Sequence, residues 1–206
     1  NSVIKVIQEG TRKLYITGTG DPFGSATLRK FLLNFKKKNF PSVKNIRLHT
    51  NGVKWTKELW DKMSDVHDLV SDAEISIDAA TKETYEKVRR GGDWDQLMEN
   101  LKFIPKEVTW FGMSMVVQDT NYKEIPKLIK LRDKLVKESG NKSIYVYFSK
   151  ITNWGTFTDK EYEKKAVWKE SHSNYSDLVR ILNENVKKSY WQDRFMGTNM
   201  TDLLKD

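Results

Sequence analysis

Short segments of this chain alternate hydrophobic and polar residues, and helix-forming segments follow them. Alternation predicts strands with one apolar and one polar face, because successive side chains of a strand point to opposite sides. The predicted strands cover residues 14–17, 45–49, 74–78, 108–118 and 144–149. The predicted helices that follow them lie at about residues 26–37, 56–63, 82–89, 95–103 and 122–136. Regular alternation of strand and helix favours an α/β fold with a parallel sheet.

The polar strand faces help to decide between two α/β architectures. In residues 45–49, for example, Arg47 and His49 lie on the face opposite Ile46 and Leu48. A doubly wound sheet buries both faces and reads as continuous apolar strands. Outer helices that cover only the apolar faces would leave the polar faces to line an interior. We therefore predict an incomplete TIM-like (β/α) barrel of about five parallel strands. An α+β sheet with one face in water is the alternative, and the helix after each strand argues against it.

Composition narrows the class of protein. The chain has 206 residues, a formal net charge of +8 and no cysteine, so it holds no disulfide or cysteine-ligated metal of its own. The three histidines are far apart in the sequence, and we predict no metal site from them. No apolar run is long enough to span a bilayer and no secretory signal is visible, so we expect a cytoplasmic protein without a membrane partner.

The positive charge raises the question of a nucleic-acid partner. The lysine clusters at residues 36–38 and 164–165 lie on segments that are typical of solvated helix faces. We therefore do not expect a nucleic-acid surface, and a basic adaptor remains the alternative.

Candidate binding residues follow the predicted strands. In parallel α/β sheets, ligands bind at the carboxyl ends of the strands. The segments at these ends are Gly18-Thr19-Gly20-Asp21-Pro22, Thr50-Asn51-Gly52, Ser76-Ile77-Asp78, residues 118–121 and residues 149–155. Glycine lets a ligand approach the main chain, and an aspartate accepts hydrogen bonds from a cationic group. Ordinary turns have the same composition, so each segment alone is a weak signal.

The order and spacing of these segments resemble those of the radical S-adenosylmethionine (SAM) superfamily. "LYITGTGDPFGS", "IRLHTNG" and "EISIDAATKETYEKVRRGG" are similar to the second-strand "GGE", third-strand "TNG" and fourth-strand "SID…TYEKiR" motifs of that family. "VVQDTNYKEI" and "YVYFSKITNWGTF" look like the fifth and sixth strands of the peptide- and sugar-modifying branch, whose members often carry SPASM or twitch extensions. The likeness implies a partial barrel core over residues 1–160 and a C-terminal helical extension over residues 161–206.

The resemblance also implies a set of SAM-binding residues. Gly18, Thr19, Gly20 and Asp21 would hold the methionine amino group, and Ser76 and Asp78 would approach the ribose or methionine portion. Arg89, or its neighbour Arg90, would pair with the SAM carboxylate. Asn51 and Gln118 at other strand ends, and Ile151 near the adenine, complete the set. Each of these residues also has a structural alternative. Asp78 could cap a helix, the arginines could interact with the dipole at a helix C-terminus, and Trp154 could be a packing residue.

The chain departs from the family in one respect. Radical SAM enzymes hold a 4Fe-4S cluster on a CxxxCxxC loop after the first barrel strand, and this chain has no cysteine. We expect no cluster and no catalytic residue in this chain, and interpret it as an N-terminally incomplete copy of an enzyme that acts on an unknown peptide, sugar or small molecule. A naturally cluster-less binding module is the alternative, and a barrel hydrolase or aldolase is a weaker one.

The incomplete barrel has a physical consequence. The strand at residues 14–17 would lie at an open edge of the sheet, and open edges invite pairing with another copy. We therefore expect self-association through this strand.

Overall fold

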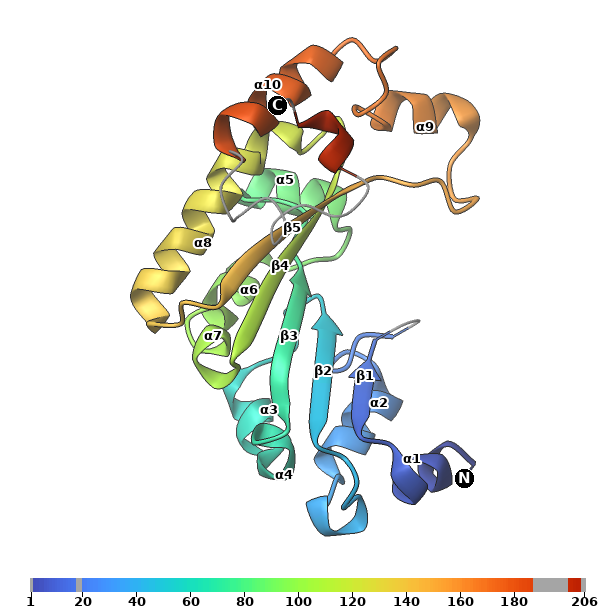
Figure 1. Ribbon diagram of the computed structural model, residues 1–206, viewed down its shortest axis with the longest axis vertical. Helices are drawn as coiled ribbons and strands as arrows, with labels where there is room; N and C mark the ends of the chain where they lie inside the picture. The colour runs from blue at the N-terminus through green and yellow to red at the C-terminus, as the bar shows by residue number, and fades with distance from the viewer. Residues whose placement is uncertain (1, 18–19, 187–199, 205–206) are drawn as a thin grey trace. The chain divides into compact units, whose positions relative to one another are not determined.

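The computed structural model describes residues 2–17, 20–186 and 200–204. One sheet has the strand order β1-β2-β3-β4-β5, and the strands run in the same direction (Figure 1). The strands are β1 (Lys13–Ile16), β2 (Asn45–Thr50), β3 (Val70–Ser76), β4 (Trp110–Val117) and β5 (Ile144–Lys150). Sequential order is that of a (β/α) barrel, whereas a doubly wound sheet reverses its strand order. The prediction of an α/β fold with five parallel strands and flanking helices is confirmed.

Helices follow each strand, mostly at the predicted places. In the described part of the chain they are α1 (Ser2–Gly10), α2 (Ala26–Leu33), η1 (Lys37–Asn39), α3 (Lys57–Asp61), α4 (Ser64–His67), α5 (Lys82–Val88), α6 (Trp94–Asn100), α7 (Ile104–Glu107), η2 (Tyr122–Glu124), α8 (Ile125–Ser139), α9 (Asp159–Lys165), α10 (Tyr175–Asn185) and η3 (Thr201–Leu203). None of these helices has the length and hydropathy that a bilayer crossing requires.

The chain forms two compact units, which we describe separately. The first unit consists of Asn1–Ser76, Asp95–Gly112 and Leu135–Ile144, and the second of Ile77–Trp94, Met113–Lys134 and Tyr145–Asp206.

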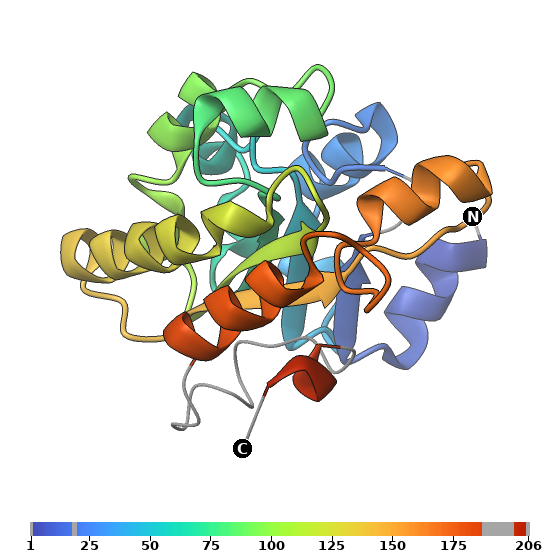
Figure 2. The ribbon, with the colours of Figure 1, turned by 90° about the horizontal axis from the view of Figure 1, so that it is seen from above.

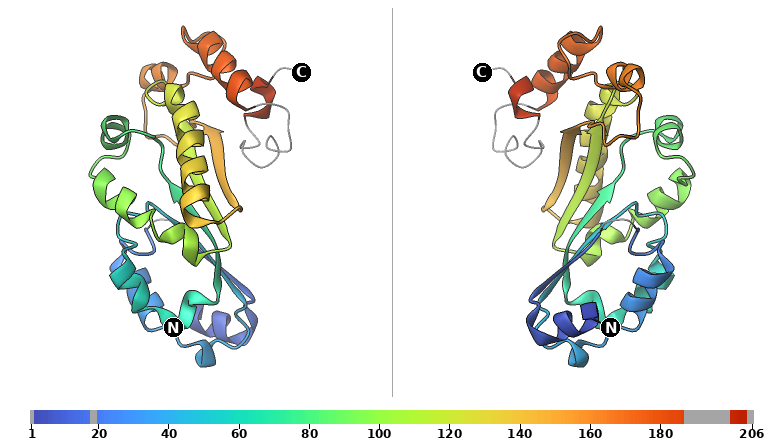
Figure 3. Two further views of the ribbon diagram at one scale, coloured as in Figure 1. Left: turned by 90° about the vertical axis from the view of Figure 1, so that its left-hand side faces the viewer. Right: turned by 90° about the vertical axis from the view of Figure 1, so that its right-hand side faces the viewer.

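In the first unit, helices cover the apolar face of β1, β2 and β3. Figure 3 shows α2 and α3 on the same side of these strands. Ile46, Leu48 and Ile75 on the strands are completely buried, as is Trp60 of α3. Burying side chains of this size contributes about 1.5–3 kcal/mol each, so this face forms the core of the unit.

An irregularity in the pairing of β2 with β3 determines which residues share the other face. Ile46 pairs with Val70, but the next residue, Arg47, pairs with Asp72. The skipped residue shifts the alternation of β3 by one, because side chains alternate with a period of two. Asp72 and Glu74 therefore lie opposite Arg47 and His49 on one polar face.

The structure also corrects the limits of β3. The prediction of a strand over residues 74–78 missed its first half, in which Val70 and Ala73 are buried. The strand also ends earlier, at Ser76, because Asp78 adopts a left-handed backbone conformation with φ of 54°.

The second unit contains α10 and most of β4, β5 and α8 (Figure 2). The Tyr122 hydroxyl in η2, just before α8, donates a hydrogen bond of 3.0 Å to Asp177 of α10. Burial, reinforced by this bond to a carboxylate, raises the pKa of Tyr122 to about 12. The neutral phenol therefore links η2 to α10 through a hydrogen bond.

Strand β1 lies at one end of the strand order, as predicted, and pairs with β2. Tyr15 in β1 is 63% exposed. The preceding helix α1 buries Ile7 but leaves Val3 and Val6 exposed. Self-association through this edge remains a prediction.

Candidate functional site

Asp21 joins the loop after β1 to the end of β2. Its Oδ1 accepts hydrogen bonds of 2.9 Å from the backbone amides of Phe23 and Gly24. Its Oδ2 accepts bonds of 2.6 Å from the Thr50 hydroxyl and 2.7 Å from the Asn51 amide. A carboxylate offers about four acceptor sites, and all four are used here. Asp21 therefore fixes the shape of the two loops rather than offering a free carboxylate.

The Thr50-Asn51-Gly52 turn is held from several directions. The Thr50 hydroxyl also accepts a bond of 3.0 Å from the Gly52 amide, and the Asn51 side-chain oxygen accepts one from Val53. Asn100, which is 2% exposed, donates to the carbonyl oxygens of Gly52 and Val53 at 2.8 Å. Among the described residues, the side-chain nitrogen of Asn51 makes no hydrogen bond. It is a donor available to a ligand.

Gly52 is required at its position in this turn. It has φ of +76°, a conformation that side-chain-bearing residues rarely adopt. A Cβ there would lie 2.7 Å from Ile75 Cδ1 and 2.8 Å from Leu97 Cδ1. The turn can therefore pack closely on the core only with glycine at this place.

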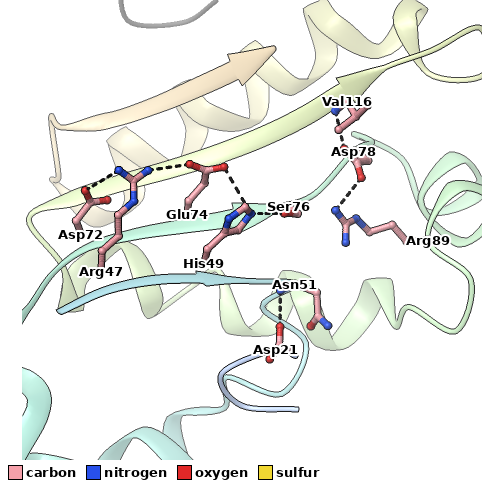
Figure 4. Close-up of polar contacts among 10 residues, drawn as sticks. All are labelled: Asp21, Arg47, His49, Asn51, Asp72, Glu74, Ser76, Asp78, Arg89 and Val116. Carbon is pink, nitrogen blue, oxygen red and sulfur yellow. Dashed lines mark hydrogen bonds and ion pairs between the residues drawn. The ribbon is translucent and has the colours of Figure 1, made fainter. Parts of the chain in front are cut away.

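The polar face of β2 and β3 carries a continuous row of charged and polar side chains, Asp72, Arg47, Glu74, His49 and Ser76 (Figure 4). Arg47 lies 3.5 Å from Asp72 and 3.0 Å from Glu74. His49 Nε2 lies 3.6 Å from Glu74 Oε1 and 2.7 Å from Ser76 Oγ. We call these five residues the polar row; they all belong to the first unit.

One member of the polar row is imperfectly satisfied. Asp72 Oδ1 is buried and has no hydrogen-bond partner in the described part of the chain. Burial raises the pKa of the Asp72 carboxyl, Arg47 opposes this and Glu74 adds to it. An unpaired buried acceptor costs about 1–3 kcal/mol, and such costs are concentrated at functional sites.

In the second unit, Asp78 and Arg89 form an ion pair of 2.7 Å between Oδ2 and Nη2 (Figure 4). Asp78 Oδ1 accepts a bond of 2.7 Å from the Val116 amide. The helix that follows, α5, is capped by Thr81, so Asp78 is not its cap. Arg89 Nε is buried and has no partner among the described residues. The pair is preorganised and leaves one guanidinium donor without an acceptor.

Two residues after β4 hold the Asp78 turn in place. Asn121 is completely buried and donates bonds of 2.9 Å to the carbonyl oxygens of Asp78 and Val116. Glu124, which is 7% exposed, accepts bonds from the Ala80 amide at 2.6 Å and the Thr81 amide at 3.1 Å. Asn121 and Glu124 have the spacing of a capping box before a helix, but both side chains reach the turn after β3 instead.

The last predicted residues are occupied by internal bonds. The Gln118 side-chain oxygen accepts a bond of 3.2 Å from Lys165. Ile151 is 6% exposed, its amide donates to Val117, and its carbonyl oxygen accepts bonds from Tyr162 and Trp168. Trp154 is 85% exposed, so the alternative that it is a packing residue is wrong.

The structure brings together some of the predicted site residues and not others. Within the first unit, Asp21 is bonded directly to Asn51, while Ser76 contacts His49. Within the second unit, Asp78 is paired with Arg89. Gly18 and Thr19 lie outside the described residues. Sequence reasoning missed Asp72 and Asn100, and it placed Asn121 at a strand end without its bonds to the Asp78 turn.

The chain supplies no site for a cysteine-ligated cluster. Its sequence contains no cysteine. Within residues 2–17, 20–186 and 200–204, no group of three or more side chains is arranged to hold a metal ion. We therefore assign no step to a cluster.

Comparison with known proteins identifies the family. The family model of the radical SAM superfamily matches residues 2–132, which is more than half of the chain. The search of curated proteins gave no match. The matched range contains the Asp21 loop, the Thr50-Asn51-Gly52 turn and the Asp78–Arg89 pair, whereas Ile151 lies beyond it. With five parallel strands in sequential order and this match, the chain belongs to the radical SAM superfamily.

Proposed function

We propose that this chain is the SAM-binding part of a radical SAM enzyme of the branch with SPASM or twitch extensions, working in the cytoplasm on a peptide, sugar or small molecule. Family membership supports SAM as the ligand. The single observation that assigns SAM binding to particular residues is the Asp78–Arg89 pair. The Nε atom of Arg89 is buried and has no acceptor among the described residues. A carboxylate is the natural partner of a guanidinium fork, and SAM carries one.

The residues present fit parts of SAM in different ways. In the first unit, the Asn51 side-chain nitrogen is available to a ligand, and Asp21 keeps the two loops in register. In the second unit, Arg89 would bind the methionine carboxylate. Asp78 orients Arg89, and the amide of Val116 fixes Asp78 in turn.

The reaction needs parts that these residues do not supply. In radical SAM enzymes, SAM is the source of a deoxyadenosyl radical that abstracts a substrate hydrogen atom. This chain contributes no thiolate, so we propose that it binds and orients SAM and is inactive by itself. A complete enzyme would require cluster ligands from outside this sequence, and a cluster-less binding module would not.

Titration with SAM, followed by amide chemical shifts, tests the proposal. Because cluster contacts are missing, we expect weak binding with a Kd of about 1 mM. Saturable shifts should appear at the amides of Asn51, Asp78 and Arg89. S-adenosylhomocysteine keeps the amino and carboxylate groups and serves as a second probe.

A matched pair of arginine variants sharpens the test. Arg89→Lys keeps the charge but removes Nε and the planar fork, and should weaken binding at least tenfold, since a charge-assisted hydrogen bond contributes about 1.5–3 kcal/mol. Arg180→Lys alters an exposed arginine paired with Asp177 and Glu184, and should change nothing. Absence of shifts at these amides, or equal effects of the two variants, would refute the proposal.

A further inference from the structure

The polar row is more than a solvated surface network. The side chain of Glu74 is 14% exposed and that of Asp72 is 25% exposed, although they carry like charges. Partly buried ion pairs must offset the cost of desolvating their charges, and a row whose members include a buried unpaired oxygen contributes less to stability. Stability therefore does not explain why these side chains are gathered on one face. Binding or chemistry is the better explanation.

His49 is the member of the row that is most open to a ligand. Its side chain is 42% exposed, compared with 33% for Arg47 and 14% for Glu74. Both of its contacts, with Glu74 and with Ser76, are made by the same ring nitrogen, Nε2. Nδ1 makes no hydrogen bond within the described residues. One nitrogen therefore orients the ring, and the other is free to contact a ligand.

The contacts favour one position for the proton in the neutral ring. Glu74 Oε1 lies 3.6 Å from Nε2, beyond hydrogen-bond distance, and the negative charge of an ionised glutamate favours a proton on this nearer nitrogen over a lone pair. Ser76 is compatible with either arrangement because a hydroxyl both donates and accepts. Nε2 then holds the proton and Nδ1 carries the lone pair, which is the form of a general base.

The same geometry argues against a serine nucleophile. In a Ser-His-acid triad, the serine and the acid contact different ring nitrogens. Here Ser76 and Glu74 share Nε2, so His49 cannot relay a proton between them. Hydrolase chemistry of that kind does not fit this face.

We propose that His49 is an acid–base residue that faces the substrate, with Nδ1 exchanging a proton with an O–H or N–H group of a sugar or peptide. The substrate O–H or N–H bond breaks, and the electron pair of that bond stays on the substrate oxygen or nitrogen. The lone pair of Nδ1 forms the new N–H bond. The resulting imidazolium is balanced by Glu74, which is a positioning residue. This inference rests on the proposed function only in taking the polar row as the face that meets the substrate.

Ring nitrogen spectra of the three histidines test the assignment directly. Correlation spectra distinguish the two neutral forms, and the variants His49→Gln, His67→Gln and His172→Gln assign the signals. We expect the neutral ring of His49 to carry its proton on Nε2. Glu74→Leu, which removes the partner that only accepts, should give a mixture of the two forms, whereas Ser76→Ala should keep the preference. A ring protonated on Nδ1 in the unaltered protein would overturn the proposal.

Chemical modification provides a second readout, with two internal controls. Diethylpyrocarbonate reacts with an unprotonated, accessible ring nitrogen. His67 is stacked on Trp60 at 4.3 Å, and His172 has both ring nitrogens in hydrogen bonds. We expect His49 to react several-fold faster than either, by mass spectrometry of peptides. Equal rates would count against the proposal. Neither experiment contains SAM, so failure here is distinguishable from failure of the SAM titration.

Discussion

The Asp21 carboxylate offers the sharpest test of how the loops of the first unit are held. Asp21→Asn replaces one oxygen by an NH2 group of nearly the same size. The amide oxygen can still accept from Phe23 and Gly24, which are bonded to Oδ1. The NH2 group then faces the Asn51 amide, a donor that loses its acceptor.

The expected loss follows from these contacts. A hydrogen bond to a charged group contributes about 1.5–3 kcal/mol, so we expect Asp21→Asn to lower the free energy of unfolding by about 2 kcal/mol. Asp21→Ala leaves three backbone amides without this acceptor, and we expect a loss of about 4 kcal/mol.

Urea unfolding monitored by circular dichroism measures the difference. With a slope of about 2 kcal/mol per molar urea, the midpoint should fall by about 1 M for Asp21→Asn and by about 2 M for Asp21→Ala. Asp68→Asn is the matched control, because the side chain of Asp68 is 80% exposed in its ion pair with Lys37. We expect a change below about 0.5 kcal/mol for this control. If Asp21→Asn unfolds at the same midpoint as Asp68→Asn, Asp21 does not hold the loops.

Three further predictions concern other parts of the chain. Gly52→Ala should destabilise the protein more than Gly140→Ala in thermal unfolding, because both residues have positive φ but a Cβ meets close neighbours only at Gly52; equal losses would contradict the overlap. The pKa of Tyr122 is raised to about 12, so the stability contributed by its neutral phenol is present below about pH 10 and lost as the pH rises to about 12. Phenolate absorbance should show a late-titrating contribution that is lost in Tyr122→Phe and kept in Tyr15→Phe. Self-association through β1 should appear in light scattering at high concentration and weaken in Tyr15→Lys, whereas a monodisperse monomer would refute it.

The sequence predicted the fold well because local patterns determine it. Alternation in residues 45–49 and 144–149 placed β2 and β5 within a residue of their observed limits. Thr158 and Glu161 have the sequence spacing of a capping box, and the structure has one between them at the start of α9. Signals of this kind depend on residues that are close together in the sequence, so the sequence alone reveals them.

The parts of the site that sequence reasoning missed depend on contacts between distant residues. Asn121 and Glu124 are three residues apart before a helix, the spacing of a capping box, yet their side chains bind the turn around Asp78 about forty residues earlier. Asp72 shares a face with Glu74 and Ser76 by simple alternation, and it was missed because the predicted strand began only at residue 74. The pairing of Asp78 with Arg89 was likewise not predicted, although both were predicted to contact SAM.

The hold of Asn121 and Glu124 on the Asp78 turn has a consequence for motion. Four backbone groups of that turn and of β4 are hydrogen-bonded to the side chains of Asn121 and Glu124. The turn and the segment that leads into α8 should therefore open together rather than separately. Deuterium uptake at the amides of Ala80 and Thr81 would then report the opening of both. These two amides follow Asp78, the residue proposed to orient Arg89. Their exchange rates would therefore report how rigidly the proposed cofactor-binding arginine is held.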